Sequence, residues 1–96
     1  MINGLYKVIS KNDTEAVIEL SDKKHSIFKA HFPLHPVLPG FTHFEIVAEV
    51  FGIEIESIKK AKFMSLITPK QILKYEKNKN KFRVLRDEEV VASFSL

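Results

Sequence analysis

The residues best suited to chemistry in this sequence are a histidine and a glutamate, His31 and Glu45, fourteen positions apart. A histidine can move a proton near neutral pH, and a carboxylate can assist a second proton transfer. Between them lie Gly40 and Phe41, close to the expected start of a helix. The free backbone N–H groups and the dipole of a helix N-terminus favour an oxygen that gains negative charge. Together these groups predict proton transfer next to a carbonyl.

The segment that holds His31 is rich in proline. The stretch HFPLHPVLPG, residues 31–40, contains Pro33, Pro36 and Pro39. Proline fixes its own φ angle and biases the residue before it toward an extended conformation. We therefore expect a stiff, non-helical strap that leads directly into the helix carrying Glu45.

This helix is expected to begin at Pro39 or Gly40 and to end at Gly52, because proline suits a first helical position and glycine suits a helix end. At 100° per residue its apolar side chains cover an arc of about 220°. The apolar residues are Phe41, Phe44, Ile46, Val47, Ala48, Val50 and Phe51, and the remaining polar stripe holds Thr42, Glu45 and Glu49. So wide an arc predicts a buried helix wrapped by a curved sheet.

The rest of the chain is typical of β-structure. Residues 5–11 and 15–20 flank a polar turn at 12–14 and predict a β-hairpin. Extended character is also predicted for residues 26–32, and the later β-rich runs are 53–67, 72–77, 81–85 and 90–96. Because these runs follow one another through short turns, we predict an α+β fold, with one helix on an antiparallel sheet of five or six strands.

The size and composition favour one small globular domain. The 96 residues are 45% hydrophobic and 28% charged, and they include no cysteine. A core of this size is often completed by a second chain, so we expect residues 1–96 to form a single domain in a homodimer or a higher even oligomer. No signal peptide or membrane span is evident, and we expect a cytoplasmic location.

Positive charge is concentrated in the second half of the chain. Residues 59–86 hold ten of the fifteen basic side chains, with Glu76 as the only acid. Such a region would attract an anionic partner, which could be an acidic protein, a nucleic acid or a membrane surface. The alternative is a solvated strand face that lysine keeps soluble.

The stretch HFPLHPVLPGFTHFE resembles the HFPxxPVxPGxxxxE motif of hot-dog-fold 3-hydroxyacyl-[acyl-carrier-protein] dehydratases, either FabZ-type or the compact ApeI-like enzymes. The later stretch IKKAKFMSLITPKQIL is similar to the strand, proline turn and next strand of that family. The resemblance implies a hot-dog fold, an antiparallel sheet wrapped around one long central helix, and dimers whose active sites combine the histidine of one chain with the acidic residue of the other.

Applied to this chain, the resemblance implies a role for three residues. His31 would remove the proton α to the thioester carbonyl, Glu45 would help the 3-hydroxyl group leave as water, and the backbone N–H of Gly40 would polarise the carbonyl. The substrate would be a 3-hydroxyacyl chain carried by acyl carrier protein, an acidic partner suited to the lysine-rich half. No metal or organic cofactor is implied, and no nucleic acid is expected.

Several positions depart from the family pattern or allow another interpretation. Leu34 and His35 replace the common Gly-Asp pair, Glu49 replaces a common glutamine, and Thr42 and His43 replace apolar residues. These departures bear on acyl-chain length and carrier specificity. For His25, His35 and His43 we favour structural roles over metal binding, and Phe28, Phe32, Phe44 and Phe51 could line either the core or a tunnel.

Two other functions remain open on the sequence alone. One is an acyl thioesterase on the same fold, although such enzymes usually place their carboxylate differently. The other is a non-catalytic acyl-binding or regulatory protein.

Overall fold

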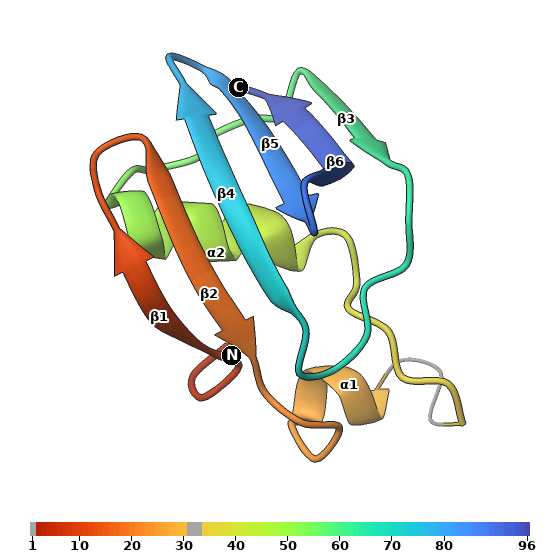
Figure 1. The fold of residues 1–96 in the computed structure, drawn as a ribbon. Helices are drawn as coiled ribbons and strands as arrows, with labels where there is room; N and C mark the ends of the chain where they lie inside the picture. Colours follow the sequence, from red (N-terminus) through yellow and green to blue (C-terminus); the bar gives the residue numbers. More distant parts are fainter. Residues whose placement is uncertain (1, 31–33) are drawn as a thin grey trace.

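The computed structural model describes residues 2–30 and 34–96 of the chain. Within these ranges the elements are β1 Tyr6–Lys11, β2 Glu15–Leu20, α1 Ser26–Ala30, α2 Thr42–Phe51, β3 Lys60–Phe63, β4 Ile72–Asn78, β5 Lys81–Arg86 and β6 Glu89–Ser95. The strands form one antiparallel sheet in the order β1-β2-β4-β5-β6-β3, and α2 lies across one face of it (Figure 1). The predicted antiparallel sheet is therefore confirmed.

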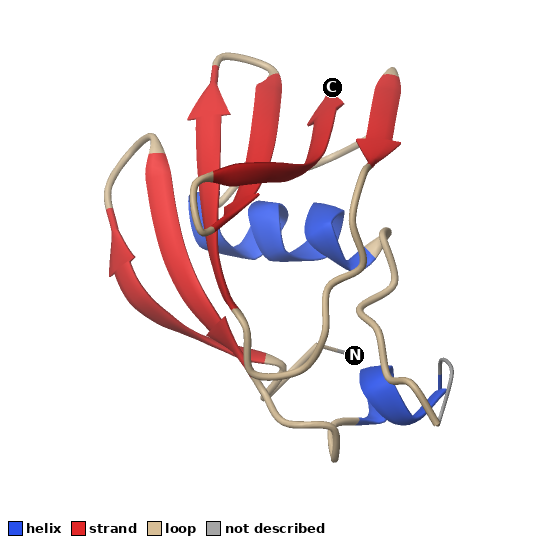
Figure 2. Cartoon of the chain, turned by 45° about the vertical axis from the view of Figure 1, so that its right-hand side comes forward, coloured by secondary structure: helices blue, strands red, loops and turns tan. Residues whose placement is uncertain are grey.

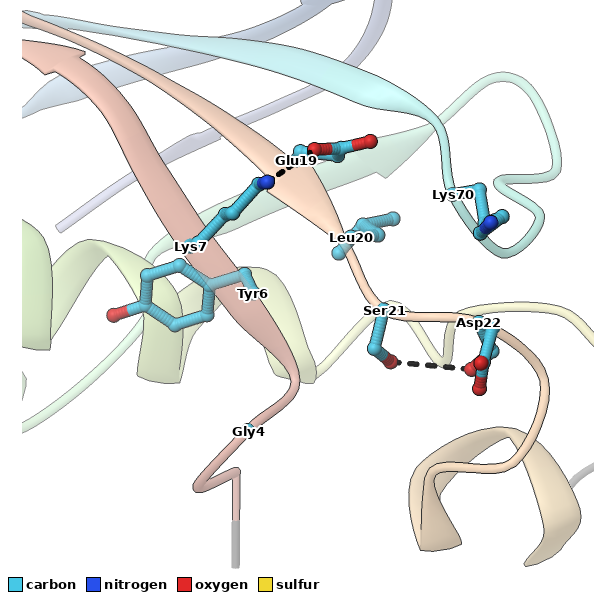
Figure 3. A pocket seen from close by; sticks show the side chains of 8 residues that line it. All are labelled: Gly4, Tyr6, Lys7, Glu19, Leu20, Ser21, Asp22 and Lys70. Atoms are coloured by element: carbon cyan, nitrogen blue, oxygen red, sulfur yellow. Dashed lines mark hydrogen bonds and ion pairs between the residues drawn. The ribbon is translucent and has the colours of Figure 1, made fainter.

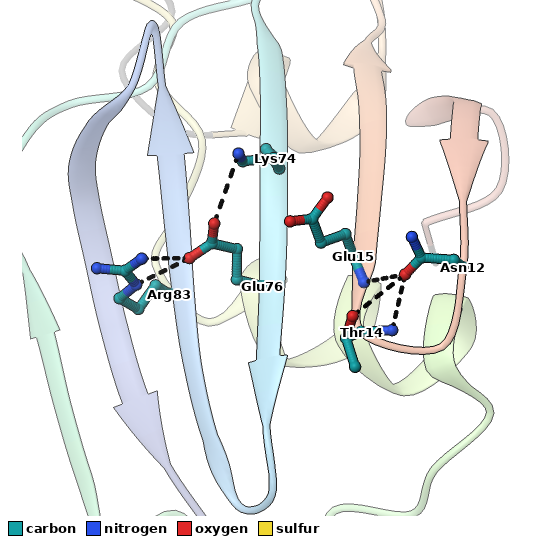
Figure 4. Close-up of polar contacts among 6 residues, drawn as sticks. All are labelled: Asn12, Thr14, Glu15, Lys74, Glu76 and Arg83. Atoms are coloured by element: carbon teal, nitrogen blue, oxygen red, sulfur yellow. Dashed lines mark hydrogen bonds and ion pairs between the residues drawn. The ribbon is translucent and has the colours of Figure 1, made fainter.

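The first hairpin is closed by Asn12. Its Oδ1 accepts hydrogen bonds from the backbone N–H groups of Thr14 and Glu15, at 2.9 and 2.8 Å (Figure 4). An asparagine side chain that binds the backbone two or three residues ahead stabilises a tight turn. The hairpin predicted for residues 5–11 and 15–20 is confirmed.

The hairpin between β5 and β6 turns at Asp87 and Glu88, whose φ angles are 52° and 67°. Two successive positive φ angles are typical of a type I′ turn, whose twist matches that of antiparallel strands. This turn brings the end of the chain back beside β5, where Phe82 lies opposite Phe94. The short turn expected between the β-rich runs 81–85 and 90–96 is confirmed.

The core lies between α2 and the sheet, which curves around the helix (Figure 2). From α2 the buried apolar side chains are Ile46, Val47 and Val50, and from the sheet the buried side chains include Ala16, Ile18, Leu73, Tyr75, Phe82, Val84, Ala92 and Phe94. Along β2 and β4 buried residues alternate with more exposed ones, as expected when only one face is covered. Of the four phenylalanines that could line core or tunnel, Phe28 is fully buried, Phe44 and Phe51 pack partly against the core, and Phe32 lies outside the described residues.

The helix begins at Thr42, two or three residues later than the sequence predicted. Pro39 and Gly40 form a preceding turn, in which the Pro39 carbonyl accepts hydrogen bonds from both the N–H and the hydroxyl of Thr42, at 3.1 and 2.5 Å. These contacts span three residues, so the chain is wound more tightly here than in an α-helix. The predicted end is confirmed, because Gly52 caps the helix with a φ of 64° and donates to the Ala48 carbonyl.

The extended character predicted for residues 26–32 is wrong where the structure describes it, because Ser26–Ala30 form the short helix α1. His25 caps this helix: its Nδ1 accepts from the N–H of Ile27 at 3.0 Å, and its Nε2 lies 2.8 Å from the Asn3 carbonyl. Capping and the burial of Ile27 and Phe28 outweigh strand propensity in this segment. Neither α1 nor α2, the helices of the described residues, has the length and apolar character needed to cross a membrane.

The strand predicted for residues 53–67 is much shorter in the structure, where β3 spans only Lys60–Phe63. The chain before it has no regular structure, although Ile53, Ile55 and Ile58 pack against the core. These alternating isoleucines contact the core from a segment without regular structure. Sequence periodicity alone does not distinguish such a segment from a strand.

Candidate active site

Glu45 lies one turn into α2, on the side of the helix that is turned away from the core. It is half-buried and lines a hollow of about 450 Å³ together with Phe44, Ala48 and the segment 53–56. Among residues 2–30 and 34–96, no hydrogen bond or ion pair engages its carboxylate. A half-buried carboxylate without a partner is available to bind or exchange a proton with a ligand.

Gly40 lies in the turn that leads into α2. Its carbonyl accepts a hydrogen bond from the N–H of His43 at 3.1 Å, and within the described ranges no acceptor engages its own N–H. The ring of Phe63 covers its α-carbon so closely that an added Cβ would lie 2.8 Å from the ring. Glycine is therefore required here for space, and its N–H is available beside the start of the helix.

His43 is buried in the core, an environment that the sequence alone did not predict. It is 2% exposed, and its Nδ1 lies 2.7 Å from the hydroxyl of the fully buried Tyr75. Burial lowers the pKa of His43 to about 4, so the imidazole is neutral at physiological pH. The signal was present in the sequence, because His43 shares a helix face with Ile46, Val47 and Val50 at spacings of three, four and seven. Its structural role, favoured over metal binding, agrees with this environment.

One turn further along the helix, Glu49 has a different environment from Glu45. It is exposed, and its Oε1 accepts a hydrogen bond of 2.6 Å from the Tyr6 hydroxyl on β1. Burial of Tyr6 and its contact with Glu49 raise the pKa of that tyrosine above its usual value. Glu49 is thus already engaged by a tyrosine, in a position open to solvent.

The predicted catalytic base, His31, lies outside the described residues, as do Phe32 and Pro33. Of the three predicted site residues, the structure describes Gly40, in the turn before α2, and Glu45, in the first turn of that helix.

Comparison with known proteins places the chain in a family. The family model of the ApeI-like proteins, described as ApeI dehydratase, matches residues 8–95. The chain belongs to the ApeI-like dehydratase family. No curated protein matches the sequence.

Among solved structures, an ApeI complex agrees with this assignment, and more distant ones share the fold. The dehydratase heterocomplex ApeI:P from Xenorhabdus doucetiae is 25% identical, with 93% of each chain covered and a TM-score of 0.69. An uncharacterized protein from Erwinia carotovora subsp. atroseptica is 20% identical over 92% of this chain and 86% of its own, with a TM-score of 0.55. The phenylacetic acid degradation protein PaaI from Thermus thermophilus is 12% identical over 99% and 97% of the two chains, with a TM-score of 0.53. These likenesses support the hot-dog-like fold.

A second hollow, of about 490 Å³, lies at the open end of the first hairpin (Figure 3). Its lining includes Tyr6, Lys70 and an ion pair between Lys7 and Glu19 at 3.2 Å. Neither Gly40 nor Glu45 reaches it. Its charged groups are exposed or already paired. Because the residues that match the dehydratase motif do not line this hollow, it is not the candidate active site.

Part of the lysine-rich half is neutralised within the sheet. Glu76 accepts hydrogen bonds from the Arg83 guanidinium at 2.9 and 2.5 Å and lies 3.5 Å from Lys74 Nζ (Figure 4). The hydrogen bond from Arg83 is the main cause of the lowered pKa of this carboxyl. The basic side chains around Glu76 are therefore partly a solvated, ion-paired strand face. Within the described ranges no cluster of three possible metal ligands occurs.

Proposed function

We propose that this chain dehydrates a 3-hydroxyacyl thioester carried by acyl carrier protein to the trans-2-enoyl thioester. The observation that carries the proposal is the half-buried Glu45 at the first turn of α2, which has no partner among the described residues and lies five residues after Gly40 in a matching dehydratase motif. A buried carboxylate has a cost unless a ligand or a cavity compensates for it, so this position is suited to substrate.

In the proposed reaction, three groups act on adjacent atoms of the substrate. His31 takes the proton from the carbon α to the thioester carbonyl, and the Gly40 N–H stabilises the negative charge that develops on the carbonyl oxygen. Glu45, in its protonated form, donates a proton to the 3-hydroxyl as the C–O bond breaks, so that water leaves and the double bond forms. The proton held by His31 then restores the glutamic acid through solvent, which balances the cycle.

A second subunit fits this proposal, because the two acid–base groups would come from different chains. A relative in the same family, the ApeI:P dehydratase, is a heterocomplex. A homodimer is the simplest arrangement for the present chain and a higher even oligomer is compatible with it, but the proposed chemistry requires only that a neighbouring hot-dog subunit complete the site.

The experiment is direct interconversion. Purified protein is incubated with 3-hydroxyacyl and, separately, 2-enoyl carrier-protein thioesters, and loss or gain of one water is followed by mass spectrometry. His31→Ala and Glu45→Gln are the variants that remove each acid–base group, and Glu49→Gln is the matched control on the same helix. Interconversion that survives both active-site changes, or release of free acid instead of an enoyl thioester, would contradict the proposal.

A further inference from the structure

The first turn of α2 holds the two polar side chains, tyrosine aside, that are buried within residues 2–30 and 34–96. They are Thr42, which is fully buried, and its neighbour His43. A buried polar group costs free energy unless it is hydrogen-bonded, and an apolar side chain of the same shape needs no partner at all. The contacts of the Thr42 hydroxyl therefore show what it adds that a valine would not.

That hydroxyl adds a second hydrogen bond to a carbonyl that already has one. The backbone N–H of Thr42 donates to the Pro39 carbonyl at 3.1 Å and closes the turn before the helix. The Thr42 Oγ1 donates to the same oxygen at 2.5 Å. Because Thr42 is fully buried, water does not compete with this bond. The side chain thus restrains a carbonyl that the backbone would already satisfy.

The Pro39 carbonyl and the Gly40 N–H belong to one peptide group. A peptide group is planar, and the bond between Pro39 and Gly40 is trans, so its C=O and N–H point in opposite directions. Holding the carbonyl toward Thr42 therefore fixes the direction of the Gly40 N–H. A hydrogen bond accepted by the carbonyl also polarises the N–H of the same group and makes it a stronger donor.

The other contacts of Gly40 hold its position and leave this direction open. The N–H of His43 binds the Gly40 carbonyl, which belongs to the following peptide group, and the ring of Phe63 covers the α-carbon. Rotation of the Pro39–Gly40 peptide group about its two flanking single bonds would leave both contacts in place. The two hydrogen bonds from Thr42 are the contacts that oppose such a rotation.

We propose that Thr42 is a positioning residue for dehydration: its hydroxyl, through the Pro39 carbonyl, aims the Gly40 N–H at the carbonyl oxygen of the substrate. The inference rests on the proposed function, in which this N–H stabilises the negative charge that develops on that oxygen. A donor of fixed direction needs no reorganisation as the charge develops, whereas a peptide group that can rotate must be reoriented in each turnover.

Two substitutions separate the hydroxyl from the shape of the side chain. Thr42→Val removes the hydroxyl and keeps the branched side chain, and Thr42→Ser keeps the hydroxyl. On a carrier-linked 3-hydroxyacyl thioester we expect Thr42→Val to lower kcat by about ten- to a hundred-fold with KM within about two-fold, because the N–H acts mainly in the transition state. Thr42→Ser should keep most of the wild-type kcat. An unchanged kcat in Thr42→Val, or a loss that serine does not restore, would overturn the proposal.

The matched control is Tyr75→Phe. It also removes a buried hydroxyl beside the first turn of α2, but this hydroxyl binds His43 Nδ1 at 2.7 Å and not the Pro39 carbonyl. We expect Tyr75→Phe to lower the midpoint of urea unfolding and to keep kcat near the wild-type value. Equal losses of kcat in Tyr75→Phe and Thr42→Val would show a general effect of core disruption and overturn the positioning role.

A second measurement observes the peptide group without substrate. The chain has three glycines, Gly4, Gly40 and Gly52, so protein labelled with ¹⁵N-glycine gives three backbone amide signals, and Gly40→Ala identifies the one from Gly40. In Thr42→Val this signal should shift, because the carbonyl of its peptide group loses a hydrogen bond, and in Thr42→Ser it should return toward the wild-type position. The Gly4 and Gly52 signals should stay in place.

The two measurements distinguish failure of this inference from failure of the proposed function. An unshifted Gly40 signal in Thr42→Val would overturn the role of Thr42 alone, even where the wild type dehydrates the thioester. Absent interconversion by the wild type would overturn the proposed function and this role with it. If Thr42→Val does not fold, Thr42→Ala removes the hydroxyl with less bulk and should give the same loss of kcat and the same shift.

Discussion

Each end of α2 has a glutamate and a glycine, but their environments differ between the two ends. Near its start, Glu45 is half-buried without a partner among the described residues, and near its end, Glu49 is exposed and bound to the Tyr6 hydroxyl. Glycine precedes the first turn because a neighbouring ring leaves no space, and glycine follows the last turn because the backbone has a positive φ. The comparison shows that, among the described residues, the carboxylate near the start of the helix is open to a ligand, whereas the one near its end already accepts a hydrogen bond.

The largest expected effect separates the two carboxylates. Glu45→Gln should lower the rate of dehydration by about 10²–10⁴-fold, which is the usual contribution of a positioned proton donor. Glu49→Gln makes the same chemical change one turn away and should keep the rate within about three-fold. Both rates are measured on the same carrier-linked thioester, with thermal unfolding as a check of the fold. Equal losses in the two variants would remove the functional distinction between the helix ends.

The next effect is the pH dependence of the free energy of unfolding, which tests the burial of His43 near the start of the helix. Because the pKa of His43 is about 4 in the folded protein and about 6.5 in the unfolded chain, the unfolded state binds more protons between these values. Stability from this group is fully present above about pH 6.5 and is lost as the pH falls toward 4. The difference corresponds to about 3 kcal/mol.

Urea unfolding at several pH values between 7 and 4 measures this loss. A His43→Gln variant keeps a polar side chain but cannot titrate, so its free energy of unfolding should fall less over the same range. Acid titration of Glu76 and the other carboxylates is common to both proteins and cancels in the difference. Parallel pH profiles would show that His43 is already solvated in the folded state.

A smaller effect compares the two glycines. Gly40→Ala places a Cβ 2.8 Å from the Phe63 ring and should cost about 1 kcal/mol of stability and reduce activity about ten-fold, because the adjacent N–H is displaced. Adding Phe63→Ala removes the clash and should restore activity toward the wild-type level. Gly52→Ala, at a φ of 64° with no neighbouring atom within 4 Å, should also cost about 1 kcal/mol, but without loss of activity. Rescue of Gly52→Ala by Phe63→Ala would contradict this explanation.

The sequence predicted those features that local chemistry determines. The turn at Asn12, the end of α2 at Gly52 and the antiparallel order of the strands each follow from turn residues, a positive φ or short connections. Glu45 could be singled out because it interrupts an apolar helix at a fixed distance from the proline-rich strap. The spacing alone predicted proton transfer next to a carbonyl, and the family motif specified dehydration as the reaction.

Features that depend on tertiary contacts were predicted poorly. α1 forms because the ring of His25 caps it and the core buries Phe28, neither of which is visible in a short β-like run. The strand expected over residues 53–67 shortens because its isoleucines pack on the core without forming a ladder. His43 lay on the apolar face by its spacing, but its partner Tyr75 is on a strand thirty-two residues away.

The smallest expected effect concerns the contact at the end of the helix. Tyr6→Phe removes the hydroxyl that donates to Glu49 at 2.6 Å while keeping the ring against the core. Since this hydrogen bond is exposed to solvent, water can replace it, and the loss should be about 0.5–1 kcal/mol of unfolding free energy. Dehydration should remain within about two-fold, because neither group takes part in the proposed proton transfers. Denaturant unfolding and the thioester assay measure both quantities, and a loss of activity approaching that of Glu45→Gln would place Glu49 in the catalytic machinery and reverse the roles of the two helix ends.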